Sequence, residues 1–180
     1  MIPFALTITM SNEDKSKATL LVEEYRSLMI YCAEKILKDR ALAEDAAQEG
    51  FIRILRNLHK VGDVKCHKTR GLMVIIVKRV AIDIYNKRAK SGVTSYDEDE
   101  MTDIPDSSPG VLDKVIGMDE YNNIVDIMNS LPDTLRDITQ LAFVHKYDYK
   151  EISELLNISY DNVRQRVSRA RSIIKSKLNK

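Results

Sequence analysis

The sequence predicts an all-α protein built from two small helical domains, and three observations support this fold class. Apolar residues recur at spacings of three and four over several long stretches, which is typical of amphipathic helices. Six glycines and four prolines among 180 residues leave little room for the many turns of a β architecture. A segment rich in serine, proline, glycine and acidic residues, without a hydrophobic period, separates the helical stretches. We therefore expect a first domain over residues 1–92, a flexible acidic linker over 93–112 and a second domain over 113–180.

Three helices are expected in the first domain. They cover residues 13–38, residues 39 to about 59, and residues 69–90. Ser11 and Asp14 are suited to cap the start of the first helix, and Asp39 precedes the periodic residues of the second. The third helix is apolar on most sides over residues 72–77 and increasingly basic after them, so we expect its start to be buried and its end exposed.

Four helices are expected in the second domain. They cover residues 114–129, a stretch that starts within 131–133 and runs to about 145, residues 149–156, and a last stretch that begins at Ser159. Pro132 suits the first turn of the second of these helices. Asn157 stands where a left-handed residue is needed between the last two helices, and Ser159 is a good N-cap. The chemistry of this turn predicts a helix-turn-helix.

The last helix displays most of its side chains. Val163, Val167, Ala170 and Ile174 follow one another at steps of four, three and four, so they form one narrow stripe facing the other helices. Opposite the stripe lie Asp161, Asn162, Gln165, Ser168 and Arg169, flanked by Arg164 and Arg171 on one side and by Arg166 on the other. A helix fits the major groove of DNA, where arginine and glutamine can pair with bases and flanking arginines can neutralise phosphates. The pattern indicates DNA binding; an amphipathic surface helix with solubilising arginines is the alternative.

The net charge of +1 conceals three blocks of charge. Residues 65–90 carry eight basic residues against Asp83 alone, a net charge of +7, and residues 157–180 carry seven against Asp161 alone, a net charge of +6. Residues 97–120 carry nine acidic residues against Lys114, a net charge of −8. Two basic modules separated by an acidic segment suit a protein that contacts nucleic acid, although solvated helix faces would give similar blocks.

Neither a disulfide framework nor a metal site is expected. Cys32 and Cys66 lie far apart without CxxC spacing, and His59 and His67 do not complete a four-ligand pattern with Cys66. The first ten residues lack a basic leader and a cleavage signal, and residues 72–77 are too few to cross a bilayer. We expect a cytoplasmic protein in a reducing compartment, without a cofactor.

The second expected helix has a polar face whose chemistry is ambiguous. The stretch LAEDAAQEGFIRILRNL at residues 42–58 exposes Asp45, Gln48, Glu49 and Arg53 away from its apolar residues. Asp45 and Glu49 are one turn apart, as in some acid/base or metal sites, but no histidine lies in register with them. The face is therefore interpreted as a solvated or binding surface rather than as an active site.

These stretches resemble a known family. LAEDAAQEGFIRILRNL, TRGLMVIIVKRVAIDIYNKR and SLPDTLRDITQLAFVHKYDYKEISELLNISYDNVRQRVSRAR are similar to regions 2 and 4 of bacterial RNA polymerase sigma factors. The short form, with only these two regions and a linker, resembles the extracytoplasmic-function (ECF) group. The similarity extends from about Leu20 to Leu178 and includes all three motifs in order. It implies a transcription initiation factor that binds core RNA polymerase and promoter DNA and has no chemistry of its own.

The resemblance also implies roles for individual residues. The residues implied to bind the clamp helices of the largest polymerase subunit are Asp45, Gln48, Glu49, Phe51 and Leu55. Those implied to recognise and open the minus-ten promoter element are Lys78, Arg79, Asp83, Asn86, Lys87 and Arg88. Those implied to contact the minus-thirty-five element are Arg164, Gln165, Ser168 and Arg169 at base-facing positions, with Asp161, Asn162, Arg166 and Arg171 around them. The family also implies contact with the flap of the second-largest subunit, passage of the acidic linker toward the active-site cleft, and control by an anti-sigma partner.

Three residues depart from the pattern of the family. Leu72 stands where a tryptophan is frequent, Arg79 where asparagine is, and Asn86 where arginine is. Leu72 lies on the apolar side of its helix, so we expect it to be a core residue, whereas Arg79 could change the preferred minus-ten base. The alternative functions are an autonomous helix-turn-helix regulator and, more distantly, an enzyme that uses the carboxylates of Asp45 and Glu49.

Overall fold

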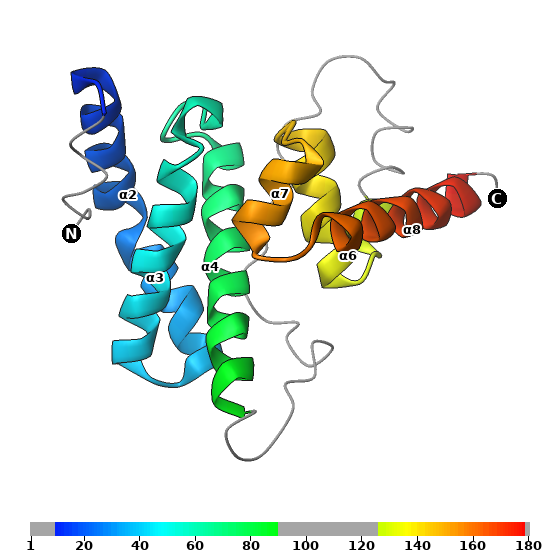
Figure 1. Cartoon of the computed structure of the whole chain (residues 1–180), viewed down its shortest axis with the longest axis horizontal. Coiled ribbons are helices and arrows are strands. Elements are labelled where there is room, and N and C mark those ends of the chain that lie inside the picture. Colours follow the sequence, from blue (N-terminus) through cyan, green and yellow to red (C-terminus); the bar gives the residue numbers. More distant parts are fainter. Residues whose placement is uncertain (1–9, 90–125, 179–180) are drawn as a thin grey trace. The chain divides into compact units, whose positions relative to one another are not determined.

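The computed structural model describes residues 10–89 and 126–178, and these residues form helices and short connections without any β-strand (Figure 1). This confirms the all-α fold class. The chain divides into two compact units, residues 1–97 and 98–180. The expected linker, 93–112, lies outside the described residues, so the expected domain boundaries stay predictions.

The first unit is a bundle of three long helices. They are α2 (Asn12–Leu37), α3 (Arg40–Leu55) and α4 (His67–Ala89), and each of them packs against the other two. A short 3-10 helix, η1 (Leu58–Lys60), follows α3. Because the bundle needs only short connections between antiparallel neighbours, Lys38 and Asp39 alone join α2 to α3.

Side-chain caps define the helix starts that the sequence predicts. The Ser11 hydroxyl accepts a hydrogen bond from the backbone N–H of Asp14 at 3.1 Å, and the Asp39 carboxylate accepts one from Leu42 N–H at 3.1 Å. Both caps satisfy N–H groups that have no partner within the helix. Lys38 ends α2 in the left-handed conformation, with φ 53°.

The second helix ends earlier than the sequence predicts. The expected end was near His59, but α3 ends at Leu55, and the N–H of Asn57 bonds to the carbonyl of Ile54 three residues back. The chain then tightens into η1. The apolar period continues through this change because Leu58 is still buried, at 4% exposure.

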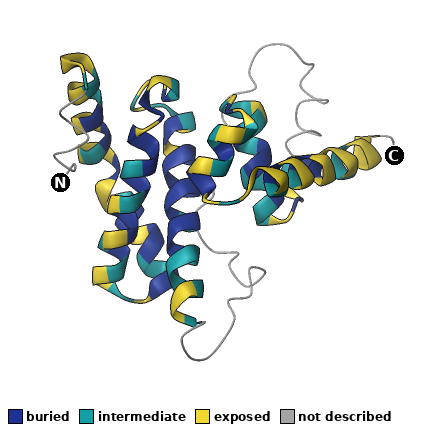
Figure 2. Cartoon of the chain, viewed as in Figure 1, coloured by how far each residue is buried: buried dark blue, intermediate teal, exposed yellow. Residues whose placement is uncertain are grey.

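The core of the first unit comes from all three helices. The fully buried side chains include Leu21, Met29, Ile54, Met73 and Ile76. The start of α4 is buried on all sides over residues 72–77, which confirms the expectation from the sequence (Figure 2). Gly50 allows α3 to lie close to α2 and α4, because a Cβ atom at this position would lie 2.7 Å from Cε of Met29 in α2 and 3.8 Å from Cα of Val77 in α4.

The second unit contains shorter helices. Residues 126–129 are helical, and α6 (Asp133–Thr139), the π-helical turn η3 (Gln140–Val144), α7 (Tyr149–Leu156) and α8 (Tyr160–Leu178) follow. The helix expected from 131–133 to about 145 is therefore α-helical only over Asp133–Thr139, and residues 114–125 of the expected helix before it lie outside the described residues. In the π-helical turn, the N–H of His145 donates to the carbonyl of Gln140, five residues earlier, at 3.0 Å.

The helices of the second unit pack against α8. Leu131 and Leu135 meet Ala170 of α8, and Ile173 and Ile174 cover this cluster. Both α6 and α7 contact α8, which places the stripe of Val163, Val167 and Ala170 in the core. No helix within the described residues is long and apolar enough to span a membrane.

Candidate functional site

The turn between α7 and α8 forms as the sequence predicts. Asp148 and Glu151 make a capping box at the start of α7, with the Asp148 carboxylate accepting from Glu151 N–H at 2.9 Å. Asn157 adopts the left-handed conformation, with φ 54° and ψ 47°. The Ser159 hydroxyl then caps α8 by accepting from Asn162 N–H at 3.2 Å. These local bonds fix the angle at which α8 leaves the turn, so α7 and α8 form a helix-turn-helix.

The outward face of α8 carries the polar residues expected there. Asp161, Arg164, Gln165, Ser168, Arg169 and Arg171 are exposed, and Asn162 and Arg166 are half-buried. Most of the α8 ribbon outside the buried stripe is accordingly yellow in Figure 2. Arg164 Nε lies 3.9 Å from Asp161 Oδ1, with both side chains more than 60% exposed. Such a long surface pair is weak, so it does not prevent the guanidinium from binding a phosphate or a base.

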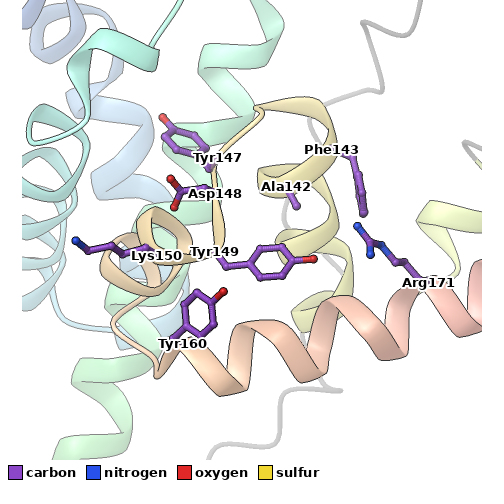
Figure 3. A pocket seen from close by; sticks show the side chains of 8 residues that line it. All are labelled: Ala142, Phe143, Tyr147, Asp148, Tyr149, Lys150, Tyr160 and Arg171. Atoms are coloured by element: carbon purple, nitrogen blue, oxygen red, sulfur yellow. The ribbon is translucent and has the colours of Figure 1, made fainter.

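Arg171 lies on the flank of α8 and faces an aromatic hollow (Figure 3). Its guanidinium carbon is 5.2 Å from the centroid of the Phe143 ring, a cation–π contact. The hollow has a volume of about 480 Å³, and its lining residues are Ala142, Phe143, Tyr147, Asp148, Tyr149, Lys150, Tyr160 and Arg171. The stacking on Phe143 holds Arg171 at the edge of the displayed face rather than at its centre. The sequence does not predict this contact, because it joins residues 28 positions apart.

Two of the tyrosines beside the hollow pair with each other, and a third is buried. The rings of Tyr149 and Tyr160 are 6.1 Å apart and tilted by 56°, which joins the start of α7 to the start of α8. Tyr147 is 3% exposed, and burial raises the pKa of its phenol to about 12. Its hydroxyl therefore stays protonated near neutral pH.

The expected polymerase-binding residues of α3 divide into two groups. Asp45 and Gln48 are exposed, and the Glu49 side chain is 46% exposed, so these three share one accessible face. Phe51 and Leu55 are 7% and 6% exposed and belong to the core of the first unit. Their apolar side chains pack inward and support the helix that carries this accessible face, and their expected role in polymerase binding stays a prediction.

Arg53 also differs from its expected position. The sequence predicts that Arg53 lies on the exposed face, but its side chain is only 10% exposed. Its Nε bonds to Glu49 Oε1 at 2.9 Å, one turn earlier in α3, and its Nη2 lies 3.6 Å from Asp83 Oδ2 in α4. A buried guanidinium needs such partners, because an unpaired charge in the protein interior is costly.

The second half of α4 becomes more exposed toward its end. Lys87 and Arg88 are exposed, while Lys78, Asp83 and Asn86 are half-buried. Arg79 is 9% exposed, so its side chain is held within the unit rather than displayed like Arg88. Leu72 is 2% exposed, which confirms that it is a core residue.

Burial dominates the environment of Asp83. It raises the pKa of this carboxyl above its ordinary value of 3.8, although Arg53, Lys87 and Arg79 act in the opposite direction. The Asp83 Oδ2 atom is buried without a hydrogen-bond partner, and Arg53 is near it at ion-pair distance. One signal in the sequence could have drawn attention to this pair, since Asp83 is the single acidic residue in the basic block of residues 65–90.

The described residues show no arrangement suited to metal chemistry. Across 10–89 and 126–178, no group of three or more His, Cys, Asp or Glu side chains is placed to hold a metal ion. Cys32 and Cys66 are both free thiols.

Comparison with known proteins agrees with this arrangement. Residues 21–91 match the family described as Sigma-70 region 2, and residues 121–174 match the family described as Sigma-70, region 4. The ECF RNA polymerase sigma factor SigW of Bacillus subtilis is 26% identical over 171 residues, which cover 88% of this chain and 87% of the relative. SigM of the same organism, also an ECF RNA polymerase sigma factor, is 27% identical over 149 residues, covering 79% and 83%. The ECF RNA polymerase sigma factor SigK of Mycobacterium sp. (strain KMS) is 25% identical over 158 residues, covering 87% and 80%.

The region 2 match lies in the first helical unit and the region 4 match lies in the second. The chain belongs to the sigma-70 family of RNA polymerase sigma factors, and within it to the ECF group. It is thus a transcription initiation factor that acts with RNA polymerase at promoters, and members of this family are not enzymes.

Proposed function

We propose that this protein recognises both elements of its promoters, with α8 at the minus-thirty-five element and the second half of α4 at the minus-ten element, while α3 holds core RNA polymerase. The observation that carries the proposal is the displayed face of α8, on a helix whose direction is fixed by Asn157 and Ser159.

In the minus-thirty-five contact, α8 lies in the major groove. Gln165 and Arg169 are exposed opposite the buried stripe, so they can reach base edges. Arg164 stands on the flank, where it meets a phosphate. Arg171 stacks on Phe143 and contributes positive charge at the margin of the same interface.

In the minus-ten contact, the basic end of α4 approaches the strand that is separated. Lys87 and Arg88 are exposed at this end and attract the phosphates. Capturing unstacked bases offsets an unstacking cost of about a few kcal/mol per step. Arg79 is 9% exposed, so it acts in this contact through neighbouring side chains rather than by direct base readout.

The polymerase contact uses the accessible face of α3. Asp45, Gln48 and Glu49 present carboxylates and an amide at the surface, and these suit a basic or polar groove of the clamp helices of the largest subunit. We extend the proposal to the flap of the second-largest subunit as partner of the second unit, and to an anti-sigma protein that masks one of these surfaces. The place of action is then the cytoplasm, with RNA polymerase at the nucleoid.

Transcription from a library of promoter fragments tests the proposal. Core RNA polymerase with this protein is expected to give RNA starts that are absent without it, downstream of two shared elements at fixed spacing. Asp45→Lys combined with Gln48→Ala should abolish these starts and core binding, because it reverses the charge at residue 45, removes the amide at residue 48 and so cancels the net negative charge of the α3 face. Glu23→Lys, which alters an exposed residue of α2, is the matched control and should leave both unchanged.

An autonomous helix-turn-helix regulator is the second candidate, and the displayed face of α8 would serve it equally well. In that case, the free protein would bind a single duplex at nanomolar affinity in physiological salt, and the α3 substitutions would not affect it. Core polymerase binding that the α3 substitutions abolish, together with only weak duplex binding by the free protein, would instead support the sigma-factor function.

A further inference from the structure

We infer that Arg53 is a positioning residue that couples the polymerase-binding face of α3 to the promoter-binding half of α4, by contacting Glu49 through its Nε and Asp83 through its Nη2. This inference rests on the proposed function of both faces.

The geometry places Arg53 between two carboxylates on different helices. Its side chain is 10% exposed, whereas those of Glu49 and Asp83 are 46% and 30% exposed, so the guanidinium lies deeper than either partner. The contact to Glu49 is a direct hydrogen bond of 2.9 Å, and that to Asp83 is an ion pair of 3.6 Å. The planar, forked guanidinium can serve two partners in different directions, which a lysine ammonium on a flexible stem does poorly.

On the α3 side, Arg53 orders a residue of the binding face. Glu49 is one turn before Arg53, the spacing at which two helix side chains meet. The bond to Arg53 restricts the Glu49 carboxylate while leaving nearly half of the side chain accessible to a partner. A preordered carboxylate loses less conformational entropy on binding than a mobile one.

On the α4 side, Arg53 reaches the one acidic residue of the basic block over residues 65–90. The charges that act on Asp83 come from Arg53, Lys87 and Arg79, so its carboxylate is shared among cations from two helices. Lys87, one turn after Asp83, is exposed at the promoter-binding end of α4. A shift of Arg53 therefore changes how strongly Asp83 holds this lysine.

Stability alone does not account for the network. Burial raises the pKa of Asp83, so the ionised carboxylate is held against a desolvation cost that its cations only partly offset. Ion pairs of this kind are often replaceable by apolar groups without loss of stability. Their benefit here is a fixed geometry between α3 and α4.

A double-mutant cycle tests the coupling. Two quantities would be measured for Glu49→Gln, Asp83→Asn and the double variant. The first is the affinity for core polymerase. The second is the rate of promoter opening, followed by the fluorescence of 2-aminopurine in the minus-ten element. With Arg53 present, the effect of the double variant should differ from the product of the single effects by roughly 3-fold or more. With Arg53→Met, the same cycle should be multiplicative within about 2-fold.

The pair Asp45 and Asp83 is the matched control. Asp45 shares the α3 face with Glu49 and is exposed, so Asp45→Asn should combine with Asp83→Asn multiplicatively. Should Arg53→Met fail to fold by circular dichroism, Arg53→Lys replaces it, with the same loss of coupling expected. A purely structural role for Arg53 would lower every affinity alike and leave the cycle unchanged.

The outcomes separate the two proposals. In one outcome, Glu49→Gln and Asp45→Asn lower the affinity for core polymerase, but the effects of Glu49→Gln and Asp83→Asn are multiplicative with Arg53 in place. The coupling is then overturned, while the assignment of the α3 face to polymerase binding stands. If neither substitution changes core affinity, the α3 face is not the polymerase surface, and the coupling falls with it.

Discussion

The backbone N–H of Asn157 donates to the carbonyl oxygen of Ser153, and this bond ends α7 with Asn157 in the left-handed conformation at φ 54°. The next N–H, of Ile158, donates to the same carbonyl at 3.1 Å. Two consecutive donors thus meet one acceptor, which fixes the turn that orients α8. The direction of the DNA-facing helix therefore depends on one residue that tolerates a positive φ.

Asn157→Ala should destabilise the protein by about 1 kcal/mol relative to Asn157→Gly, because alanine in the left-handed region brings its Cβ close to the following carbonyl. Urea unfolding of the two variants measures the difference. Lys38 also has a positive φ, of 53°, so Lys38→Gly should be stabilising or neutral in the same assay. Equal stability of the two Asn157 variants would contradict the role given to this position.

Substitutions on α8 should separate base contacts from phosphate contacts. Gln165→Ala and Arg169→Ala should each cost about 1–3 kcal/mol on the preferred promoter and relax the preference at one base position. Arg164→Ala should weaken all promoters alike and reduce the salt dependence by about one phosphate contact. Binding of the holoenzyme to promoter variants at several salt concentrations distinguishes these results, and a uniform loss for Gln165→Ala would exclude base contact.

The stability of Asp83→Asn relative to the unsubstituted protein should depend on pH. The pKa of Asp83 in the folded protein is raised above 3.8. The contribution of this carboxyl to the free energy of unfolding is therefore fully present below that pH, where the carboxyl is neutral. It is lost as the pH rises through the folded-state pKa. The asparagine variant should thus gain stability relative to the parent as the pH rises from about 3.5 to 7. Urea midpoints at each pH measure the gain, and a constant or opposite difference would show that the ion pair with Arg53 outweighs burial.

Gly50 should tolerate alanine but not valine. A Cβ atom there meets the flexible end of Met29, which can move, and alanine favours the helix by about 1 kcal/mol, so Gly50→Ala should remain within about 1 kcal/mol of the parent. Valine adds methyl groups near the backbone of α4 at Val77 and should cost about 1–3 kcal/mol. Thermal unfolding of the two variants tests this, and equal melting temperatures would mean that the helices separate readily.

Local chemistry explains why much of the fold could be predicted from the sequence. The caps at Ser11, Asp39 and Ser159 and the left-handed Asn157 depend on residues within a few positions of one another. The buried stripe of α8 likewise follows from a regular spacing. Such features are set by the chain near them, so they do not require knowledge of the tertiary structure.

Features that depend on distant partners were missed. Arg53 was expected to be exposed because arginine usually lies at the surface, yet its burial depends on Asp83, thirty positions later. The stacking of Arg171 on Phe143 also depends on packing, between α8 and η3. The end of α3 was placed too late because Leu58 keeps the apolar period after the α-helix has ended.

The π-helical turn at Gln140–Val144 makes this part of the chain sensitive to length rather than to composition. Removing a single residue there would allow an ordinary α-helical turn, but each α-helical residue turns the chain by about 100° about the helix axis. The chain after the deletion, including the buried Tyr147 and the cap at Asp148, would then be rotated by about 100° about the helix axis. As a result, α7 would no longer place Ile152 and Leu155 toward the core. Insertions and deletions between Thr139 and Tyr147 should accordingly be much more damaging than substitutions at exposed positions such as Phe143.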